Sequence, residues 1–385
     1  MPVPNSSDRR LRVLQCVSHL ALGGAERVAV LLMENLQNRY DFSLFAVRGL
    51  GDGDVGAALR QRLLERNIPL TSGPRVPMRF GGMVTGAIGL ARAVRRFKPD
   101  LIHLHTEIPE AAYATMVLLF PKLRRIPVVR TIHNSVIWNS WRALGRACDR
   151  QLAHACVAGV SRDALQAFFS LRSSSGAHSS SAPATVIYNG VSSPRAIRPK
   201  ASTDHVIRMI YGGRLEPEKG TDLLPEIIAR TRLPAGRRAH LTIYGSGRHS
   251  SQLRLLERTP PKDWTVEVHV PITDFADQLG KFDLALIPSR YEGLSLFAIE
   301  AVLAGMQVVA TDATGLREAL APDHPWLAQT GDPQSFAVAL QSACAHEERW
   351  PAIAEVGRAF ALERFDPLKM SSAYHGLYGQ ALNRQ

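Results

Sequence analysis

Short apolar segments alternate along the chain with longer segments in which apolar residues recur at helical spacing. The series of short segments begins with LRVLQCVS and continues with FSLFAV, DLIHLH, VVRTI and ACVAGV. Helical patterns over residues 25–38 and 55–66 separate its early members. Such alternation is typical of βα units, which build a parallel sheet with helices on both faces. We therefore predict a doubly wound α/β domain in the first half of the chain.

The same alternation restarts after residue 204, with HVIRMIYGG, HLTIYG, VEVHV, FDLALIP and QVVAT. We therefore predict two Rossmann-like domains, over residues 1–198 and 199–365, and a C-terminal helix over residues 366–385 that packs back on the first. The Ser-rich stretch RSSSGAHSSSAPA precedes the strand-like TVIYNG, so we interpret it as a surface loop within the first domain. Ligands of open α/β sheets bind beyond the carboxyl ends of the strands. Two facing domains therefore predict a ligand site in a central cleft.

Charge is distributed unevenly between the halves. Residues 1–200 hold 27 Lys and Arg against 12 Asp and Glu, whereas residues 201–385 hold 19 against 22. Basic clusters next to apolar residues suit helices that face an anionic membrane or an anionic acceptor, although a solvated basic face is an equal alternative. The sequence has no recognisable nucleic-acid-binding motif, so we expect no such partner. The clusters comprise Arg92, Arg95, Arg96 and Lys98, followed by Lys122, Arg124 and Arg125.

Cysteine spacing and hydropathy indicate the compartment. The four cysteines are scattered without CxxC spacing, which argues against a disulfide framework and a structural zinc site. No apolar run approaches the ~18 to 20 residues that span a bilayer. We expect a cytoplasmic protein, with peripheral attachment to the inner face of the cytoplasmic membrane as a further hypothesis.

The first candidate for chemistry is HLALGGAER, which follows the first strand. Gly23 and Gly24 would open a helix near Ala25, where the backbone can approach an anion or a sugar closely. The segment lacks GxGxxG spacing, and no convincing acidic residue follows about twenty residues later, so a dinucleotide site is disfavoured. An ordinary turn is the alternative.

The second candidate is YGGRLEPEKGTDLL, a strand that ends in two glycines. Arg214 and Lys219 follow at the mouth of a helix. Two cations beside a helix N-terminus suit a diphosphate, because Arg can bind two oxygens and Lys supplies a point charge. A capped surface helix with solvated charges is the alternative.

The third candidate is PSRYEGLSLFAIEAVLAG, in which Glu292 precedes a helix and Glu300 lies inside it. The two glutamates would lie roughly 12 Å apart along the helix axis, too far for a paired general acid and base, so we expect them to bind different parts of one long ligand. The small residues Gly293 and Ser295 would place backbone N–H groups at the helix start, where a phosphate can bind. Taken alone, such a pair of glutamates is a solvated helix face in most proteins.

In their order, GGAER, TIHN, VIYNG, GRLEPEKG and PSRYEGLSLFAIEAVLAG resemble the motifs of glycosyltransferase family 4, the retaining group 1 enzymes of the GT-B fold. The closing ERFDPLKMSSAYHGLY is similar to the final helices of that family. The spacing from Glu292 to Glu300 matches its EX7E element. Two positions depart from the pattern: Gln307 stands where the family usually has Pro, and FDLAL replaces the commoner AD.

The resemblance implies a role for each matching residue. Arg214 and Lys219 would hold the donor diphosphate, Glu300 the ribose hydroxyls, and Glu292 would lie near the transferred sugar. His133 in TIHN would lie beside the reacting sugar; without the resemblance, a satisfied structural histidine is the commoner interpretation.

The resemblance also implies where the loop glycine and the helix start act. Gly24 would face the donor phosphate or the acceptor, and Gly293, Leu294 and Ser295 would contact the donor.

We therefore expect a retaining hexosyltransferase, with front-face attack and no metal or other cofactor. Its donor would be a UDP- or GDP-sugar, and its acceptor a lipid-linked glycan, a polysaccharide or lipopolysaccharide. The enzyme would have to stabilise the departing diphosphate more than the bound donor. Asp52, Gly53 and Asp54 match a DxD metal motif, but a turn is the better interpretation of GDGD.

Two other classes of function remain open. A GT-B-like protein without activity could serve as an assembly or membrane-associated subunit, although the presence of all four charged site residues argues against this. An NAD-dependent oxidoreductase would need the GxGxxG turn, whereas the chain offers only GGAER and YGSGR.

Overall fold

The computed structural model describes residues 9–21, 23–51, 53–77, 80–173, 182–194, 197 and 205–384. The chain divides into two compact units: unit 1 comprises Met1–Ile187 with Pro367–Gln385, and unit 2 comprises Tyr188–Asp366. Most of the Ser-rich stretch, as well as the expected domain boundary at 198/199, lies outside the described residues.

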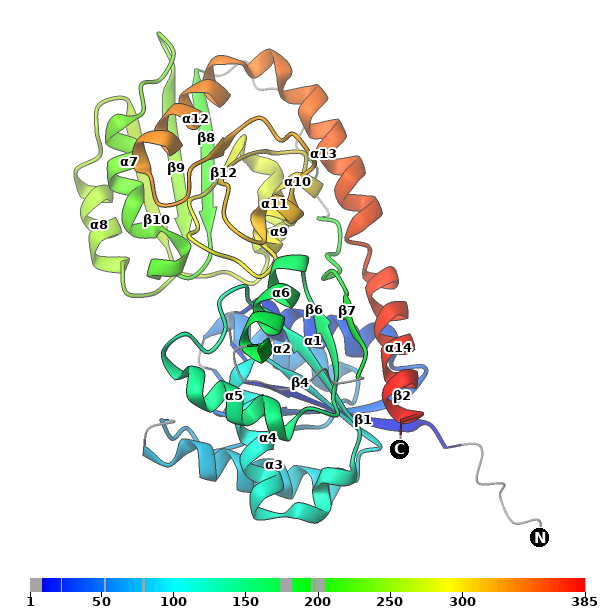
Figure 1. The fold of residues 1–385 in the computed structure, drawn as a ribbon. Helices are drawn as coiled ribbons and strands as arrows, with labels where there is room; N and C mark the ends of the chain where they lie inside the picture. The colour runs from blue at the N-terminus through cyan, green and yellow to red at the C-terminus, as the bar shows by residue number, and fades with distance from the viewer. Residues whose placement is uncertain are drawn as a thin grey trace. The chain divides into compact units, whose positions relative to one another are not determined.

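Unit 1 is built around a parallel sheet (Figure 1). Among the described residues it has seven strands in the order β3-β2-β1-β4-β5-β6-β7. The strands are β1 (Leu11–Val17), β2 (Tyr40–Ala46), β3 (Leu70–Ser72), β4 (Leu101–His105), β5 (Val128–Ile132), β6 (Cys156–Gly159) and β7 (Ala184–Val186). The α-helices are α1 (Gly24–Leu36), α2 (Asp54–Glu65), α3 (Gly82–Phe97), α4 (Glu107–Leu119), α5 (Arg142–Gln151), α6 (Arg162–Ser173) and α14 (Pro367–Leu382). The short 3-10 helices are η2 (Pro121–Arg125) and η3 (Asn139–Trp141).

The inner strands of unit 1 are buried along their whole length, as helices on both faces of a parallel sheet require. Helices α3 and α4 pack on each other and, with apolar residues of β1 and β4, enclose a core centred on Leu14, Leu104 and Met116. Helix α14, red in Figure 1, packs against α1, β4, β5 and β6. The C-terminal segment therefore belongs to the same unit as the N-terminal strands.

Unit 2 repeats this architecture with a six-stranded parallel sheet in the order β10-β9-β8-β11-β12-β13, as far as its residues are described. The strands are β8 (Val206–Gly212), β9 (Arg238–Tyr244), β10 (Trp264–His269), β11 (Leu284–Ile287), β12 (Gln307–Thr311) and β13 (Leu327–Ala328). The α-helices are α7 (Leu224–Arg230), α8 (Ser250–Arg258), α9 (Phe275–Gln278), α10 (Leu296–Leu303), α11 (Leu316–Ala319), α12 (Pro333–Ala345) and α13 (Trp350–Arg364). The 3-10 helices are η4 (Pro217–Lys219), η5 (Thr221–Leu223), η6 (Leu279–Lys281) and η7 (Glu347–Arg349).

Both sheets have the strand order of a Rossmann fold, with the first strand of each unit at the centre. The chain leaves β1 toward β2 on one side, whereas β4 lies on the other, and β8 has the same relation to β9 and β11. Each unit thus has a topological switch point at the carboxyl ends of its central strands, where ligands of this fold bind. The structure confirms the predicted fold class of two doubly wound Rossmann-like units.

Candidate functional site

The switch point of unit 2 brings together two segments that are far apart in the sequence. Residues 213–223 follow β8, and residues 288–295 follow the neighbouring strand β11. Because both strands run in the same direction, the two segments leave the sheet at the same edge. Of the seven site residues that the sequence predicts in the second half, six lie in these segments, and the seventh, Glu300, lies in α10, which follows the second segment.

Lys219 and Glu292 form an ion pair across the switch point. The Lys219 ammonium donates to both carboxylate oxygens of Glu292, at 2.7 Å to Oε1 and 2.6 Å to Oε2. The Ser289 hydroxyl donates to the same Oε1 at 2.8 Å. The Glu292 side chain is 9% exposed and that of Lys219 is 22% exposed. A cation that a carboxylate holds in a fixed position at the end of the sheet can stabilise charge that develops on a ligand without much reorganisation.

A second ion pair holds the two segments together. Arg290 donates to both carboxylate oxygens of Asp222, at 2.7 and 2.8 Å, and to the backbone oxygen of Pro217 at 2.6 Å. The hydrogen bonds from Arg290 lower the pKa of Asp222 below its ordinary value. A bidentate Arg–carboxylate pair fixes both distance and orientation. Lys219 therefore lies on a turn whose position is set by the segment that carries Glu292.

Arg214 lies on the same turn and is more exposed. Its side chain is 51% exposed and contacts Glu218, four residues further along, at 2.9 Å. The Tyr211 hydroxyl donates to the Arg214 carbonyl oxygen at 2.8 Å, and burial raises the pKa of Tyr211 well above its ordinary value, so this hydroxyl keeps its proton. The backbone of Arg214 is thus fixed while its guanidinium is accessible to an anion.

The start of α10 is buried and capped. Ser295 is the N-cap residue, and its hydroxyl accepts the backbone N–H of Ala298. Gly293 and Leu294 are buried just before it. The predicted ribose ligand Glu300 lies within α10 and is 1% exposed. The structure therefore places the second-half site residues in one region, while their contacts with a donor remain predictions.

Gly24 begins α1 in unit 1, close to where the sequence placed the helix start. The preceding residue, Gly23, packs against the carboxylate of Glu26: a Cβ at position 23 would lie 2.0 Å from Glu26 Oε2. The acidic side chain therefore lies at the positive end of the α1 dipole. The Ser18 and Thr106 hydroxyls meet at 2.7 Å across the neighbouring switch point.

His133 follows β5 directly and is half-buried. Its Nε2 lies 2.8 Å from Nδ1 of His105, the last residue of β4. Burial lowers the pKa of His133 to about 3, so the imidazole is neutral at physiological pH. A neutral ring can exchange hydrogen bonds with sugar hydroxyls but carries no charge of its own. His133 and Gly24 belong to unit 1, and the other site residues to unit 2.

Several residues of the unit 2 site were not predicted from the sequence. Ser289, Arg290 and Asp222 were missed, although the first two stand in the quoted PSRYEG motif. An aromatic cluster also lies at the carboxyl ends of β9 and β10. Tyr244 stacks on His269 with ring centroids 5.2 Å apart, and Phe275 contacts both Tyr244 and Phe297.

Among the described residues, no group of three or more His, Cys, Asp or Glu side chains could hold a metal ion. Asp52 of the DxD-like segment lies outside the described residues. Gly53 has φ of +104°, a value that L-residues rarely adopt, and Asp54 begins α2. The described part of GDGD therefore forms a turn into a helix.

Two family profiles match the chain, one in each half. The profile described as "Glycosyltransferase Family 4" matches residues 22–195, and that described as "Glycosyl transferases group 1" matches residues 207–346. The chain belongs to glycosyltransferase family 4. The sequence motifs had indicated this family, and the profiles confirm it.

Curated relatives share moderate identity with this glycosyltransferase-family chain. A glycogen synthase of Mycobacterium tuberculosis (strain H37Rv) is 29% identical over 59% of the chain, and the match spans 55% of the length of that relative. The putative teichuronic acid biosynthesis glycosyltransferase TuaC of Bacillus subtilis (strain 168) is 28% identical over 74% of the chain and 71% of its own length. The chain thus spans about half the length of the glycogen synthase that it matches.

Solved structures of the same fold cover nearly the whole chain. Anabaena Alr3699/HepE in complex with UDP and glucose superposes with a TM-score of 0.75 at 19% identity, covering 96% of this chain and 100% of that one. Sucrose-phosphate synthase from Thermosynechococcus elongatus gives 0.76 at 15% identity, covering 98% of this chain and 100% of that one. At such identities the likeness shows the fold. Within the described residues, no helix is long and apolar enough to cross a bilayer.

Proposed function

We propose that this chain is a retaining glycosyltransferase that moves a hexose from a UDP- or GDP-sugar to a lipid-linked glycan, a polysaccharide or lipopolysaccharide. The observation that carries the proposal is the ion pair between Lys219 and Glu292, at 2.6 Å, at the switch point of unit 2 in a chain of this family. Arg214 lies on the same turn, so two cations are available to one diphosphate.

The proposed chemistry uses these cations on the leaving group. When the bond from the sugar to the diphosphate breaks, negative charge grows on the diphosphate and positive charge on the sugar ring. Lys219 and Arg214 stabilise the negative charge on the diphosphate. The loss of one such preorganised donor raises the activation barrier by about 2–4 kcal/mol. The Glu292 carboxylate orients Lys219, and the resemblance to the family implies that it would lie near the transferred sugar. Neither role requires a divalent metal, so we propose transfer without one.

Similar proteins support either uridine or guanosine as the base of the donor nucleotide. The Anabaena structure contains UDP, whereas a Corynebacterium glutamicum relative, 28% identical over 41% of the chain, is a GDP-mannose-dependent mannosyltransferase. A further structure of the Anabaena protein contains UDP-glucose, so a sugar activated by a nucleoside diphosphate is named for both proteins.

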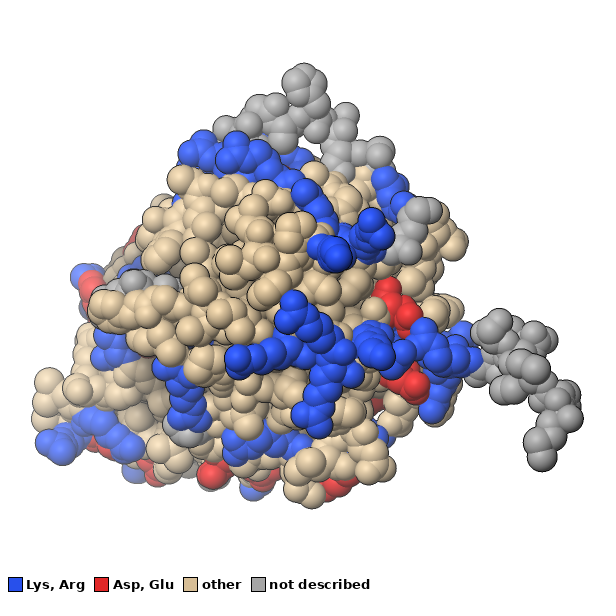
Figure 2. Space-filling model, turned by 90° about the horizontal axis from the view of Figure 1, so that it is seen from below, with Lys and Arg blue, Asp and Glu red and all other residues tan. Residues whose placement is uncertain are grey.

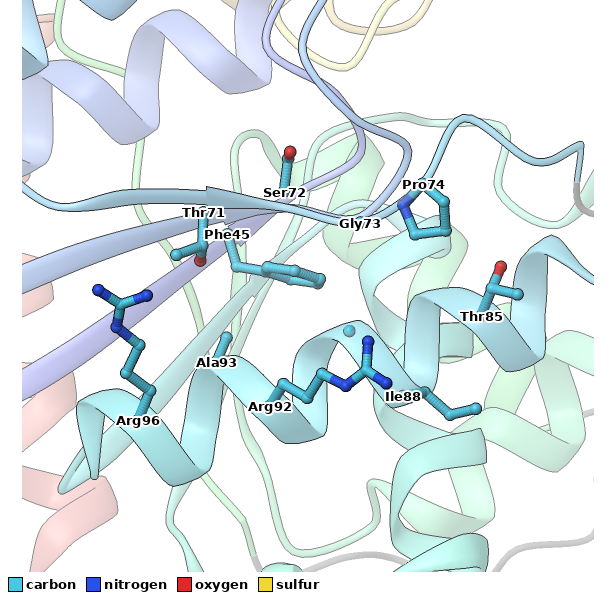
Figure 3. A pocket seen from close by; sticks show the side chains of 11 residues that line it. Phe45, Thr71, Ser72, Gly73, Pro74, Thr85, Ile88, Arg92, Ala93 and Arg96 are labelled. Carbon is cyan, nitrogen blue, oxygen red and sulfur yellow. The ribbon is translucent and has the colours of Figure 1, made fainter.

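An anionic acceptor is supported by a pocket on unit 1, shown in Figure 3. It has a volume of about 370 Å³ and lies between α3 and the end of β3. Arg92 and Arg96, one helical turn apart on α3, line it together with the apolar ring of Phe45. The Thr71 hydroxyl is buried beside it, with no hydrogen-bond partner in the described part of the chain. Guanidinium groups over an apolar floor suit a phosphate or carboxylate attached to a sugar or lipid.

Attachment to an anionic membrane is supported by a neighbouring surface, which we call the basic patch: Arg95, Lys98, Leu118, Leu119, Lys122, Arg124 and Arg125. All seven side chains are exposed, and Leu118 and Leu119 are 65% and 48% exposed. The Arg95 guanidinium stacks on Phe120, at 4.6 Å from the ring centre, and joins α3 to the end of α4. On the face of unit 1 seen in Figure 2, Lys and Arg side chains outnumber Asp and Glu. Exposed leucines among cations suit the interface of an anionic bilayer.

Thermal stabilisation by nucleotides tests the donor site without requiring the acceptor. We would measure the melting temperature with UDP, GDP, ADP and NAD, each with and without magnesium, because a ligand that binds only the native state stabilises it by mass action. We expect a shift with UDP or GDP that does not depend on magnesium. Arg214→Ala should weaken the binding of that nucleotide about tenfold or more, since a charge-assisted hydrogen bond is lost.

Arg230→Ala provides a matched control. Arg230 also pairs with a glutamate four positions away, Glu226 at 2.7 Å, and is 48% exposed. It lies at the far end of α7 and should leave nucleotide binding unchanged. An equal loss in both variants would contradict the assigned site. A shift with NAD alone would favour the oxidoreductase, and no shift with any nucleotide would favour a non-catalytic subunit.

A further inference from the structure

A line of polar side chains crosses the face of the unit 1 sheet that α14 covers. Such a face is ordinarily apolar, and burying polar groups there is costly unless each has a hydrogen-bond partner. Six members of the line are fully buried, and the seventh, at its end, is half-buried. The line consists of His133, His105, Gln15, Tyr378, His103, Thr131 and Tyr374.

The strand register places these side chains on one face. Gln15 of β1 is paired with His103 of β4, and His105 is paired with Thr131 of β5. Side chains two residues apart on a strand share a face, so His103 and His105 lie together, with ring centres 4.0 Å apart. Tyr374 and Tyr378 of α14 complete the line from above the sheet.

The end of the line at His133 is a chain of three groups. His133 Nε2 lies 2.8 Å from His105 Nδ1, and His105 Nε2 lies 2.7 Å from Gln15 Oε1. The Gln15 amide nitrogen donates to the Tyr378 hydroxyl at 2.9 Å. In this orientation of the amide, the Gln15 nitrogen faces α14 and the oxygen faces His105.

The other end of the line, at Tyr374, is also joined by hydrogen bonds. The Tyr378 hydroxyl meets His103 Nδ1 at 2.8 Å, and His103 Nε2 meets the Thr131 hydroxyl at 2.7 Å. That hydroxyl meets Tyr374 at 2.9 Å. If Tyr378 donates its proton to His103, every group in the line is satisfied, with one proton in each hydrogen bond.

The acceptor at Gln15 determines which ring nitrogens of His105 and His133 carry a proton. Burial lowers the pKa of His103 and His105 well below the ordinary value, so each ring is neutral and has one N–H and one lone pair. The Gln15 oxygen can only accept, so the proton of His105 is on Nε2. His105 Nδ1 therefore accepts, and the proton of His133 is on Nε2.

We propose that Gln15 and His105 are positioning residues that hold His133 as its Nε2–H tautomer and leave Nδ1 as a hydrogen-bond acceptor for a hydroxyl of the bound sugar or acceptor. This inference rests on the proposed function, in which His133 lies beside the reacting sugar. With the other tautomer, Nδ1 would carry a proton and could no longer accept from that hydroxyl. The same line makes α14 a support of the site, because Tyr378 orients Gln15.

Nitrogen NMR of the protein labelled with ¹⁵N-histidine tests the tautomer directly, without turnover. Two-bond proton–nitrogen correlations distinguish a protonated ring nitrogen from a bare one, and His133→Asn identifies the signals by difference. In the wild type we expect a bare Nδ1 and a protonated Nε2 at His133. In Gln15→Leu, His105 loses its acceptor and can move its proton to Nδ1, so we expect the proton of His133 to move to Nδ1 in part or completely.

Tyr374→Phe is the matched control. It also removes a hydrogen bond from this buried line, but the Thr131 hydroxyl still accepts from His103, so the tautomer of His133 should not change. We expect kcat to fall about tenfold in Gln15→Leu, with the donor KM within about twofold, and to stay near wild type in Tyr374→Phe.

Two results would overturn the inference: a proton on Nδ1 of His133 in the wild type, or equal effects of the two variants on both the NMR pattern and kcat. A wild-type protein that turns over no nucleotide sugar would instead refute the proposed function. The NMR outcome is independent of that result.

Discussion

Lys219 depends on its neighbour Gly220 in two independent ways. Gly220 has φ of +63°, a left-handed conformation that favours glycine. A Cβ at this position would also lie only 1.8 Å from the backbone oxygen of Pro288. The turn that carries Lys219 and the segment that leads to Glu292 are therefore in contact through their backbones at this point.

We predict that Gly220→Ala lowers the free energy of unfolding by about 3 kcal/mol or more, because left-handed strain of roughly 1–3 kcal/mol adds to the displacement of the Pro288 backbone. Chemical denaturation measures this loss. Nucleotide binding should weaken as well, since Lys219 moves with the turn.

Gly236→Ala separates the two causes. Gly236 has a similar φ of +76°, but apart from its own atoms and those of its chain neighbours, no atom of the described residues lies within 4 Å of its Cβ position. The Gly236→Ala variant should lose only the part of the unfolding free energy that comes from left-handed strain, and it should bind nucleotide normally. If both variants lost the same stability, the close backbone contact would have no energetic role.

At the scale of the element, a buried ionic cluster ties β5 to three helices of unit 1. Arg130 donates to both oxygens of Glu110, at 2.9 Å each, and to Asp149 at 2.7 Å. Arg172 of α6 donates to the same aspartate at 3.0 Å, and the ring of Phe168 lies beneath both guanidinium groups. With Arg130 and Asp149 both 1% exposed, removal of one partner leaves a buried charge without compensation.

We predict that Asp149→Asn costs about 3–5 kcal/mol of stability at pH 7 and that this cost shrinks in acid. Burial acts to raise the pKa of Asp149, but the hydrogen bonds and charges of Arg172 and Arg130 outweigh it and lower the pKa. A lowered pKa stabilises the folded protein above the unfolded value of about 3.9, and this stabilisation disappears as the pH falls through the folded value. Urea denaturation at pH 7 and below pH 4 measures the difference.

Asp41→Asn is the surface control. Asp41 pairs with Arg10 at 3.1 Å, but the two side chains are 44% and 54% exposed. Its loss should cost no more than about 1 kcal/mol. A cost at Asp149 that did not decrease in acid would show that the lost stability comes from packing rather than charge.

The sequence predicted the long strands and helices because their periodicity extends over many residues. The core strands such as LIHLH and the helix at residues 54–65 lie within a residue or two of their predicted positions. The strands β3 and β13 were missed because three and two residues are too few to show alternation.

The site was less accessible to sequence reasoning. Arg214, Lys219 and Glu292 are visible as charges beside glycines at strand ends, whereas Ser289 and Asp222 show their role only through contacts between segments that are far apart in the chain. The sequence does contain one sign of the polar line. Two histidines in the buried strand LIHLH are unusual at positions that ordinarily hold apolar residues, and they mark the polar line below α14.

At the scale of the whole molecule, the excess of basic residues lies in the half of the chain that forms most of unit 1. Residues 1–200 hold 27 Lys and Arg against 12 Asp and Glu, while residues 201–385 are nearly balanced at 19 against 22. Neither fold nor donor chemistry explains this asymmetry, because both units are built on the same strand order. The anionic partner of unit 1 that we propose would explain it.

We predict that vesicles containing an anionic phospholipid bind the protein at low salt and release it as salt rises, because the Debye length falls below about 10 Å above 0.1 M. Lys122→Glu, Arg124→Glu and Arg125→Glu, combined in η2, should weaken binding at least tenfold, since each basic residue near such a surface contributes about 1 kcal/mol. Sedimentation measures the bound fraction. The matched control reverses three exposed charges of unit 2, Arg232, Arg258 and Lys262.

The two triple variants carry the same net charge, so they separate a local surface from general electrostatic attraction. A loss confined to the η2 variant would place the membrane contact at the basic patch. In that case the double variant Leu118→Ser and Leu119→Ser should reduce the vesicle binding that persists at high salt, because salt does not screen the burial of apolar side chains. Equal losses in both triple variants would show attraction without a docking surface. Without binding to anionic vesicles at low salt, the basic residues would either serve the acceptor or form a solvated face. Substitution of Arg92 and Arg96 would then distinguish the two, because only a role in acceptor binding would raise the acceptor KM.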